Sequence, residues 1–163
     1  MKNLRVVADS SCLIGLAYIK QFKLLKELLD SIYIPEAVYN EVVIKGKNEP
    51  GVKELEEAIN NGWIKRKRVK NKASIEALSI TLGRGESEVI TLCKELDVDF
   101  ALIDEKLARD TAELMNIKTM GVIGIIDLAI KKGFEVDKRK LVDQLRNKGF
   151  RVSDELYRKM FPD

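Results

Sequence analysis

The sequence predicts an α/β protein in which a mostly parallel sheet of about five strands lies between helices. Short apolar runs alternate with amphipathic segments along almost the whole chain, and two of the runs end in an aspartate. The chain has 163 residues, of which 45% are hydrophobic, so it suits one domain and hardly two. We therefore expect a single domain over residues 1–163, with the last ~30 residues forming a helical C-terminal extension.

The strands are predicted from short runs rich in branched and aromatic residues. They cover 4–8, 31–34, a basic segment beginning at 63–64, 100–103 and 117–119. The helices are predicted from apolar residues at helical spacing, and Pro35 suits the first position of its helix. They cover 12–17, 22–29, 35–43, 52–60, 73–81, 86–96, 105–115, 122–131, 138–146 and 153–160. Gly62 and the run Gly83-Arg84-Gly85 interrupt the helical pattern.

The composition indicates a cytoplasmic protein without a membrane partner. No apolar stretch approaches the about 18 residues of a membrane-spanning helix. The N-terminus lacks the apolar middle and the cleavage site of a signal peptide. Cys12 and Cys93 both lie in apolar helical patterns, which favours buried thiols in a reducing compartment over a disulfide.

The chain contains no histidine, and this absence excludes several kinds of chemistry. It excludes a Ser-His-Asp triad, a Cys-His pair and a nuclease built on paired histidines. It also leaves too few ligands for a zinc site. An enzyme with this composition must rely on carboxylates, lysines, hydroxyls or metals held by oxygen.

Two of the predicted strands end in an aspartate, Asp9 and Asp104. In open parallel sheets, ligands bind at the carboxyl ends of the strands. Each aspartate could simply cap the following helix, because Asp is a favoured N-cap. Their occurrence at the same edge of one sheet favours a functional role.

Helical phase separates the glutamates near these strands. Glu41 shares a face with Ala37, Val38 and Ile44, so it is expected to point inward. Glu86 likewise shares its stripe with the apolar residues 89, 90 and 93, and it begins a helix where free N–H groups favour anions. Glu36 and Glu88 are expected at the surface or behind the site. Either inward glutamate could instead be an ordinary residue at the edge of an apolar stripe.

Four gathered carboxylates require compensation. At about 4 Å each like-charged pair costs on the order of 4 kcal/mol at an effective dielectric of 20. Some carboxyls would stay protonated, or a cation would bind. Mg²⁺ and Mn²⁺ prefer oxygen ligands and support phosphoryl displacement without histidine. The sequence therefore predicts a metal site and catalytic centre made of Asp9, Glu41, Glu86 and Asp104.

These residues lie in four ordered motifs that resemble the PIN-domain family. The motifs are Val6-Val7-Ala8-Asp9-Ser10-Ser11, Ile34-Pro35-Glu36-Ala37-Val38-Tyr39-Asn40-Glu41-Val42, Leu82-Gly83-Arg84-Gly85-Glu86-Ser87-Glu88-Val89-Ile90 and Leu102-Ile103-Asp104-Glu105. Their order and spacing fit over roughly residues 4–130. The third is similar to the VapC-like subgroup that carries Gly-Arg-Gly-Glu.

The resemblance implies a three-layer α/β/α sandwich and Mg²⁺- or Mn²⁺-dependent cleavage of single-stranded RNA. It also implies an RNA partner, a role as the toxin of a toxin–antitoxin pair with an antitoxin protein as partner, and a homodimer. Whether one or two metal ions bind is left open, because Glu105, Lys106 and Leu107 stand where many toxins carry a second aspartate.

Residues 65–72 hold six cations and no acid. They could follow an RNA backbone and make binding sensitive to salt. Alternatively, they form a solvated edge strand whose lysines discourage pairing with another sheet. Arg84 adjoins Glu86 and could contact the scissile phosphate or pair with a nearby acid. The expected nucleic-acid contacts are Ser10, Ser11, Arg84, Lys65, Arg66, Lys67 and Arg68.

Three other interpretations are open to test. A phosphatase of the haloacid-dehalogenase type would use Asp9 as nucleophile, but it wants a second aspartate at the position of Ser11. A phosphoacceptor receiver domain is disfavoured in a similar way. A catalytically inactive PIN module would bind RNA or a protein partner without cleaving.

Overall fold

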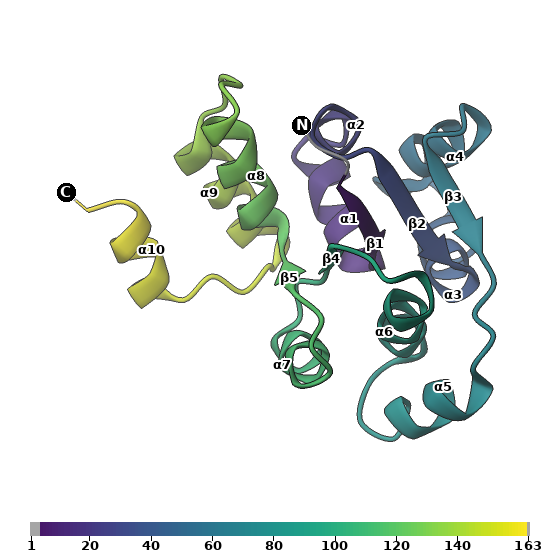
Figure 1. Cartoon of the computed structure of the whole chain (residues 1–163). Helices are drawn as coiled ribbons and strands as arrows, with labels where there is room; N and C mark the ends of the chain where they lie inside the picture. The colour runs from purple at the N-terminus through teal and green to yellow at the C-terminus, as the bar shows by residue number, and fades with distance from the viewer. Residues whose placement is uncertain (1–3, 163) are drawn as a thin grey trace.

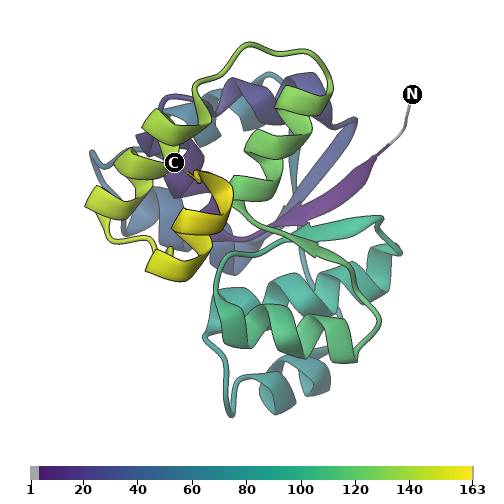
Figure 2. The ribbon, with the colours of Figure 1, turned by 90° about the vertical axis from the view of Figure 1, so that its left-hand side faces the viewer.

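The computed structural model describes residues 4–162. Its centre is a five-stranded sheet in the order β3-β2-β1-β4-β5, in which every neighbouring pair is parallel. The strands are β1 Arg5–Ala8, β2 Ser31–Pro35, β3 Ile64–Lys67, β4 Phe100–Leu102 and β5 Thr119–Met120. Helices cover both faces (Figure 2), which confirms the predicted three-layer α/β/α sandwich.

The helices before β4 are α1 Ser10–Tyr18, α2 Lys23–Leu28, α3 Glu36–Tyr39, α4 Val52–Asn60, α5 Lys72–Leu78 and α6 Arg84–Leu96. Those after it are α7 Lys106–Leu114, α8 Val122–Lys131, α9 Lys138–Lys148 and α10 Asp154–Met160. A π-helix, η1 Asn40–Ile44, follows α3 directly. Figure 1 shows α6 and α7 on one side of the sheet and α1, α2 and α8 on the other.

Burial explains the order of the strands. Val6, Val7 and Ala8 of the central β1 are fully buried, as expected for a strand covered on both faces. The edge strand β3 buries only Ile64 and exposes three basic residues. This agrees with an edge that discourages pairing with another sheet. The other edge strand, β5, is only two residues long.

Several predicted boundaries are wrong. The predicted helix 35–43 is divided into α3 and the π-helix, and Pro35 closes β2 instead of opening the helix. The helix expected to begin at Glu86 begins at Arg84. The last strand covers Thr119 and Met120 and leaves out Ile117. The position of this strand is set by its pairing with β4, in which Ala101 lies beside Thr119 and Leu102 beside Met120.

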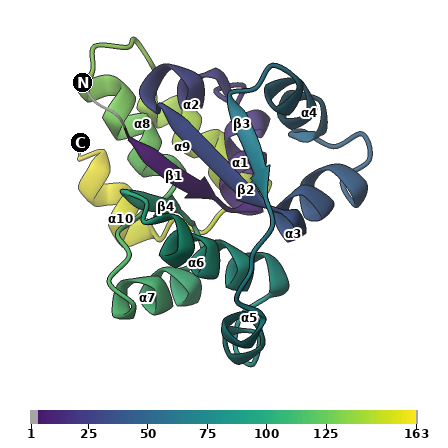
Figure 3. The ribbon, with the colours of Figure 1, turned by 45° about the vertical axis from the view of Figure 1, so that its right-hand side comes forward.

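The C-terminal region consists of helices, as expected from the sequence. Leu141 and Leu145 of α9 join the hydrophobic core, whereas α10 buries no residue. Figures 1 and 3 show α10 beside α9, away from the sheet. The division of the chain into one domain with a helical extension stays a prediction. Among residues 4–162, no helix is long and apolar enough to cross a membrane.

Candidate functional site

Asp9 lies at the carboxyl end of the two central strands. β1 and β4 are paired from Val6–Phe100 to Ala8–Leu102, and the Asp9 N–H donates to the Leu102 carbonyl at 2.9 Å. The Asp9 side chain is only 2% exposed, and its Oδ1 accepts a hydrogen bond from the Ser10 N–H at 2.7 Å. Asp9 is therefore the N-cap of α1. Its buried side chain also lies at the edge of the sheet where ligands bind in open parallel sheets.

Asp104 follows β4 and does not cap the next helix. Glu105 caps α7 instead, accepting from the Ala108 N–H at 3.3 Å. Asp104 Oδ1 accepts from the N–H of Val122, the first residue of α8, at 3.0 Å. Gly121 lies so close to this carboxylate that a Cβ at position 121 would collide with Oδ1. Among residues 4–162, the other oxygen, Oδ2, is buried without a hydrogen-bond partner at ordinary distance, although the Cys12 thiol lies close enough to lower the pKa of the carboxyl.

The π-helix carries Glu41 to the N-terminus of α6. The Ser10 hydroxyl donates to Glu41 Oε1 at 2.8 Å. A Cβ at Gly85 would lie 2.8 Å from Glu41 Oε2, so only glycine leaves room for the carboxylate there. The inward direction predicted for Glu41 agrees with this position. The predicted apolar stripe that Glu41 shares with Ile44 is wrong, because Ile44 is 60% exposed. The wider turn of the π-helix rotates Ile44 away from the face that Glu41 occupies.

Glu86 is the third residue of α6 and takes part in a capping interaction. Its carboxylate accepts from the Gly83 N–H at 3.2 Å, at the start of the helix. It is half-buried, and burial raises its pKa, with further contributions from Glu105 and Glu41. Glu86 therefore lies beside Glu41 and is not a distant surface residue.

The four acids influence one another electrostatically. Burial raises the pKa of Asp9 from 3.8 to about 7, and repulsion from Glu86, Glu41 and Asp104 adds to this effect. Burial also raises the pKa of Asp104, against the opposing effects of the Val122 N–H, the Cys12 thiol and Arg109. The structure thus places Glu41, Glu86 and Asp104 within electrostatic range of Asp9.

The residues present fit a divalent cation. Asp104 offers an unpartnered buried oxygen. Gly85 and Gly121 leave room beside the carboxylates of Glu41 and Asp104. At Asp9, repulsion from the neighbouring acids would be relieved by a positive ion. Over residues 4–162, no three or more Asp, Glu, Cys or His side chains lie close enough together to hold one metal ion. Ser10 and Gly83 instead hold Glu41 and Glu86 by hydrogen bonds.

A family model described as DUF3368, PIN domain, matches residues 5–162. The chain belongs to the PIN-domain family. PIN domains are commonly nucleases and generally use divalent metal ions. No curated protein matches the chain. Among solved structures it is similar to a domain of a functionally unknown protein from Methanocaldococcus jannaschii DSM 2661, with 20% identity, a TM-score of 0.49, and coverage of 72% of this chain and 90% of that chain.

Glu88 of this PIN domain lies behind the site, which is one of the two positions expected for it from the sequence. It is only 7% exposed, although helical phase suggested that it points away from the core. Its Oε1 accepts from the Ala37 N–H in the first turn of α3 at 3.1 Å, and its Oε2 accepts from Arg84 Nε at 2.7 Å. Glu88 therefore ties α6 to the helix that leads to Glu41. The Arg84–Glu88 spacing of i,i+4 was the signal available in the sequence.

The predicted nucleic-acid contacts of the PIN domain are divided between two places. Ser10 and Arg84 lie at the acidic site; the Arg84 side chain is 68% exposed and pairs with Glu88, one of its two predicted alternatives. The Ser11 hydroxyl is buried and finds no hydrogen-bond partner among the residues that the structure describes. The remaining four lie on and after β3: Lys65, Arg66, Lys67 and Arg68. Of these, Arg66 is tied to Glu36 and lies 3.7 Å from the centre of the Tyr39 ring.

Proposed function

We propose that this PIN domain is a Mg²⁺- or Mn²⁺-dependent endoribonuclease that cleaves single-stranded RNA. The observation that supports it most is the convergence of Asp9, Glu41, Glu86 and Asp104 at the carboxyl end of β1 and β4, with a buried Asp104 oxygen left without a partner. An unsatisfied buried carboxylate oxygen is costly, and a cation would satisfy it. These four acids are the residues that would hold the metal.

A bound divalent ion would supply an activated water and would stabilise the negative charge of the transition state. The residues of this chain have separate tasks. The Ser10 hydroxyl orients the Glu41 carboxylate through its hydrogen bond. Arg84 is exposed beside Glu86 and held by Glu88, so its guanidinium is placed to bind the scissile phosphate.

The test compares Asp9→Asn with Asp97→Asn, a matched change at the exposed C-cap of α6. Both proteins are purified identically and given a labelled single-stranded RNA with Mn²⁺ or with EDTA. We expect Mn²⁺-dependent cleavage by the wild type and by the Asp97 variant and none by the Asp9 variant. Equal cleavage by all three would overturn the proposal. Small phosphate esters serve as the phosphatase control.

We further propose that the chain is a member of the VapC-like Gly-Arg-Gly-Glu subgroup, acting in the cytoplasm as a homodimeric toxin neutralised by an antitoxin protein. The run Gly83-Arg84-Gly85-Glu86 supports this placement. Induced expression in bacteria should stop growth with the wild type and not with Asp9→Asn. Growth unaffected by the wild-type protein at equal expression would refute the toxin role. Light scattering after size exclusion reports the dimer.

A further inference from the structure

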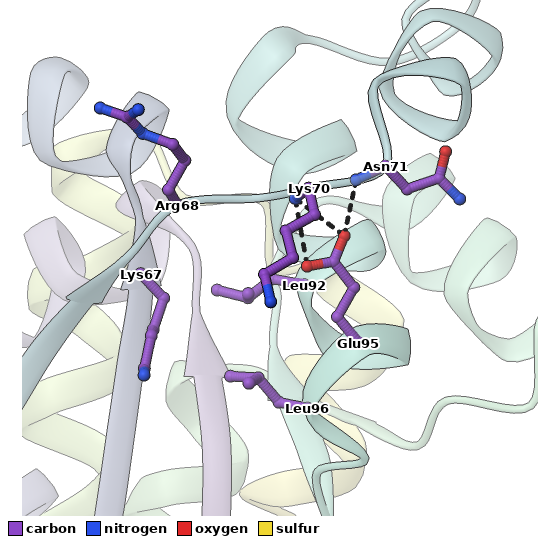
Figure 4. A pocket seen from close by; sticks show the side chains of 7 residues that line it. All are labelled: Lys67, Arg68, Lys70, Asn71, Leu92, Glu95 and Leu96. Atoms are coloured by element: carbon purple, nitrogen blue, oxygen red, sulfur yellow. Dashed lines mark hydrogen bonds between the residues drawn. The ribbon is translucent and has the colours of Figure 1, made fainter.

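A groove of about 500 Å³ lies between the segment that follows β3 and the second half of α6. Figure 4 shows Lys67, Arg68 and Lys70 along the segment and Leu92 and Leu96 on the helix. Asn71 and Glu95 complete the lining. The groove therefore combines a basic wall with an apolar floor.

Strand alternation places the lysines of β3 on this side of the sheet. Successive side chains of a strand point to opposite faces, so Lys65 and Lys67 share one face and Arg66 takes the other. Lys65 is paired with Tyr33 of β2, and Lys67 Nζ lies 6.0 Å from the centre of the Tyr33 ring. Arg5 of β1 lies 5.6 Å from the same ring. Cations from two strands, β1 and β3, thus gather around the Tyr33 ring of β2.

The positive charge of the basic wall is not neutralised locally. Within residues 4–162, Lys65, Lys67, Arg68 and Lys70 form no ion pair with a carboxylate. Glu95 is the acid in the groove, and its two oxygens accept hydrogen bonds from the Lys70 and Asn71 N–H groups at 2.8–3.2 Å. Edge protection explains exposed lysines on β3, but it does not explain Arg68 and Lys70, which follow the strand.

Helix α6 connects the groove to the acidic site. Glu86 lies in its first turn and Leu92 and Leu96 in its second half. At 1.5 Å per residue, the groove begins about 9–15 Å along the helix from Glu86. With about 3.4 Å or more between phosphates of a strand, this separation is a few nucleotides.

We propose that this groove binds the sugar–phosphate backbone of the single-stranded RNA whose scissile bond lies at the acidic site. Lys67, Arg68 and Lys70 neutralise phosphates, and Leu96, which is partly exposed beside the buried Leu92, contacts an unpaired base or ribose. The inference rests on the proposed ribonuclease function and adds the path of the substrate. An acidic protein segment is the competing occupant of such a wall.

The experiment measures binding of a fluorescein-labelled single-stranded RNA by anisotropy in EDTA, where metal-dependent cleavage is absent. It compares the wild type with Lys67→Gln/Lys70→Gln and with a control, Lys131→Gln/Lys132→Gln, which removes two exposed lysines at the end of α8. Each lost phosphate contact should lower the slope of log K against log salt by about 0.7. The groove variant should therefore lose about 1.4 in slope. The ratio of its affinity to that of the wild type should then be on the order of 25-fold lower at 0.1 M salt than at 1 M salt.

The outcomes separate this inference from the function on which it rests. The control should match the wild type in slope and affinity. The groove variant should show a raised KM with kcat unchanged in Mn²⁺, because it keeps all four acids. If the wild type cleaves RNA and the groove variant retains its affinity and slope, the inference is overturned and the ribonuclease proposal stands. If the wild type neither binds nor cleaves RNA, both are overturned.

Discussion

The Glu41 carboxylate lies against the backbone of Gly85, with no space between them for a methyl group. Glu41 belongs to the π-helix and Gly85 to the first turn of α6, 44 positions later in the chain (85 − 41). The contact therefore fixes one acid-bearing element against another. It makes position 85 a sensitive probe of the acidic site.

Gly85→Ala should displace the Glu41 side chain and lower RNA cleavage about 100-fold, because small misplacements of catalytic groups have effects of this size. The free energy of unfolding should stay within about 1 kcal/mol of wild type, since alanine is the better helix former by about that amount. Cleavage assays and urea denaturation measure the two effects. Gly83→Ala is the control, because a Cβ there meets only Glu86 Oε1 at 3.7 Å. Similar activity in both variants would contradict the prediction.

The metal-free protein should lose stability as the pH rises from about 4 to about 7. Folded Asp9 has a pKa of about 7 and the unfolded residue one of 3.8, so the native state holds more protons throughout this window. Ionising Asp9 in the folded state costs on the order of 4 kcal/mol. Urea denaturation in EDTA at several pH values should show the fall in the wild type and a flatter profile in Asp9→Asn. Parallel profiles would show that another group is responsible.

Mn²⁺ should raise the melting temperature of the wild type, because the ion binds the folded state and relieves repulsion among the four carboxylates. At about 100 times the dissociation constant the gain is about 2.7 kcal/mol, or roughly 5–10 °C for a chain of this size. Differential scanning fluorimetry with increasing Mn²⁺ measures it. Asp97→Asn should respond like the wild type and Asp9→Asn should not. An unchanged melting temperature at millimolar Mn²⁺ would argue against a metal site.

Glu88→Ala should lower the free energy of unfolding by about 1–3 kcal/mol, because it leaves the buried Ala37 N–H without an acceptor. Arg84→Ala should change stability by no more than about 1 kcal/mol, because its ion pair with Glu88 is largely exposed on the arginine side. If Arg84 binds the scissile phosphate, its loss still lowers cleavage. Chemical denaturation together with cleavage assays distinguishes the two residues. Equal destabilisation by both variants would contradict the assignment of Glu88.

The fold could be predicted because its signals are local and repeated. The buried run Val6–Ala8 and the basic run after Ile64 show a central and an edge strand directly in their composition. The boundaries near the site could not be predicted in the same way. A π-helix differs from an α-helix by one hydrogen-bond register, and Asn40–Ile44 contains no residue that demands it.

The candidate site was predictable where it depends on strand ends. Asp9 and Asp104 follow apolar strands, and parallel pairing must bring them to the same edge. Glu88 was expected at the surface or behind the site, but its partner was not predicted, because helical phase gives a direction from one helix and not the N–H group that α3 brings to it. The groove beside α6 was missed because its two walls, residues 67–71 and residues 92–96, are far apart in the sequence.

The parallel pairing of β1 with β4 also has a consequence for biosynthesis. The Arg5 N–H and the Asp99 carboxylate, which meet at 2.7 Å beside this pair, are 94 positions apart in the chain. Asp104 is then held by Val122, which is translated later still. A nascent polypeptide that has not yet delivered β4 and the start of α8 from the ribosome lacks a complete acidic centre. If the protein cleaves RNA, a nascent chain is therefore unable to do so until both of these segments have emerged and folded.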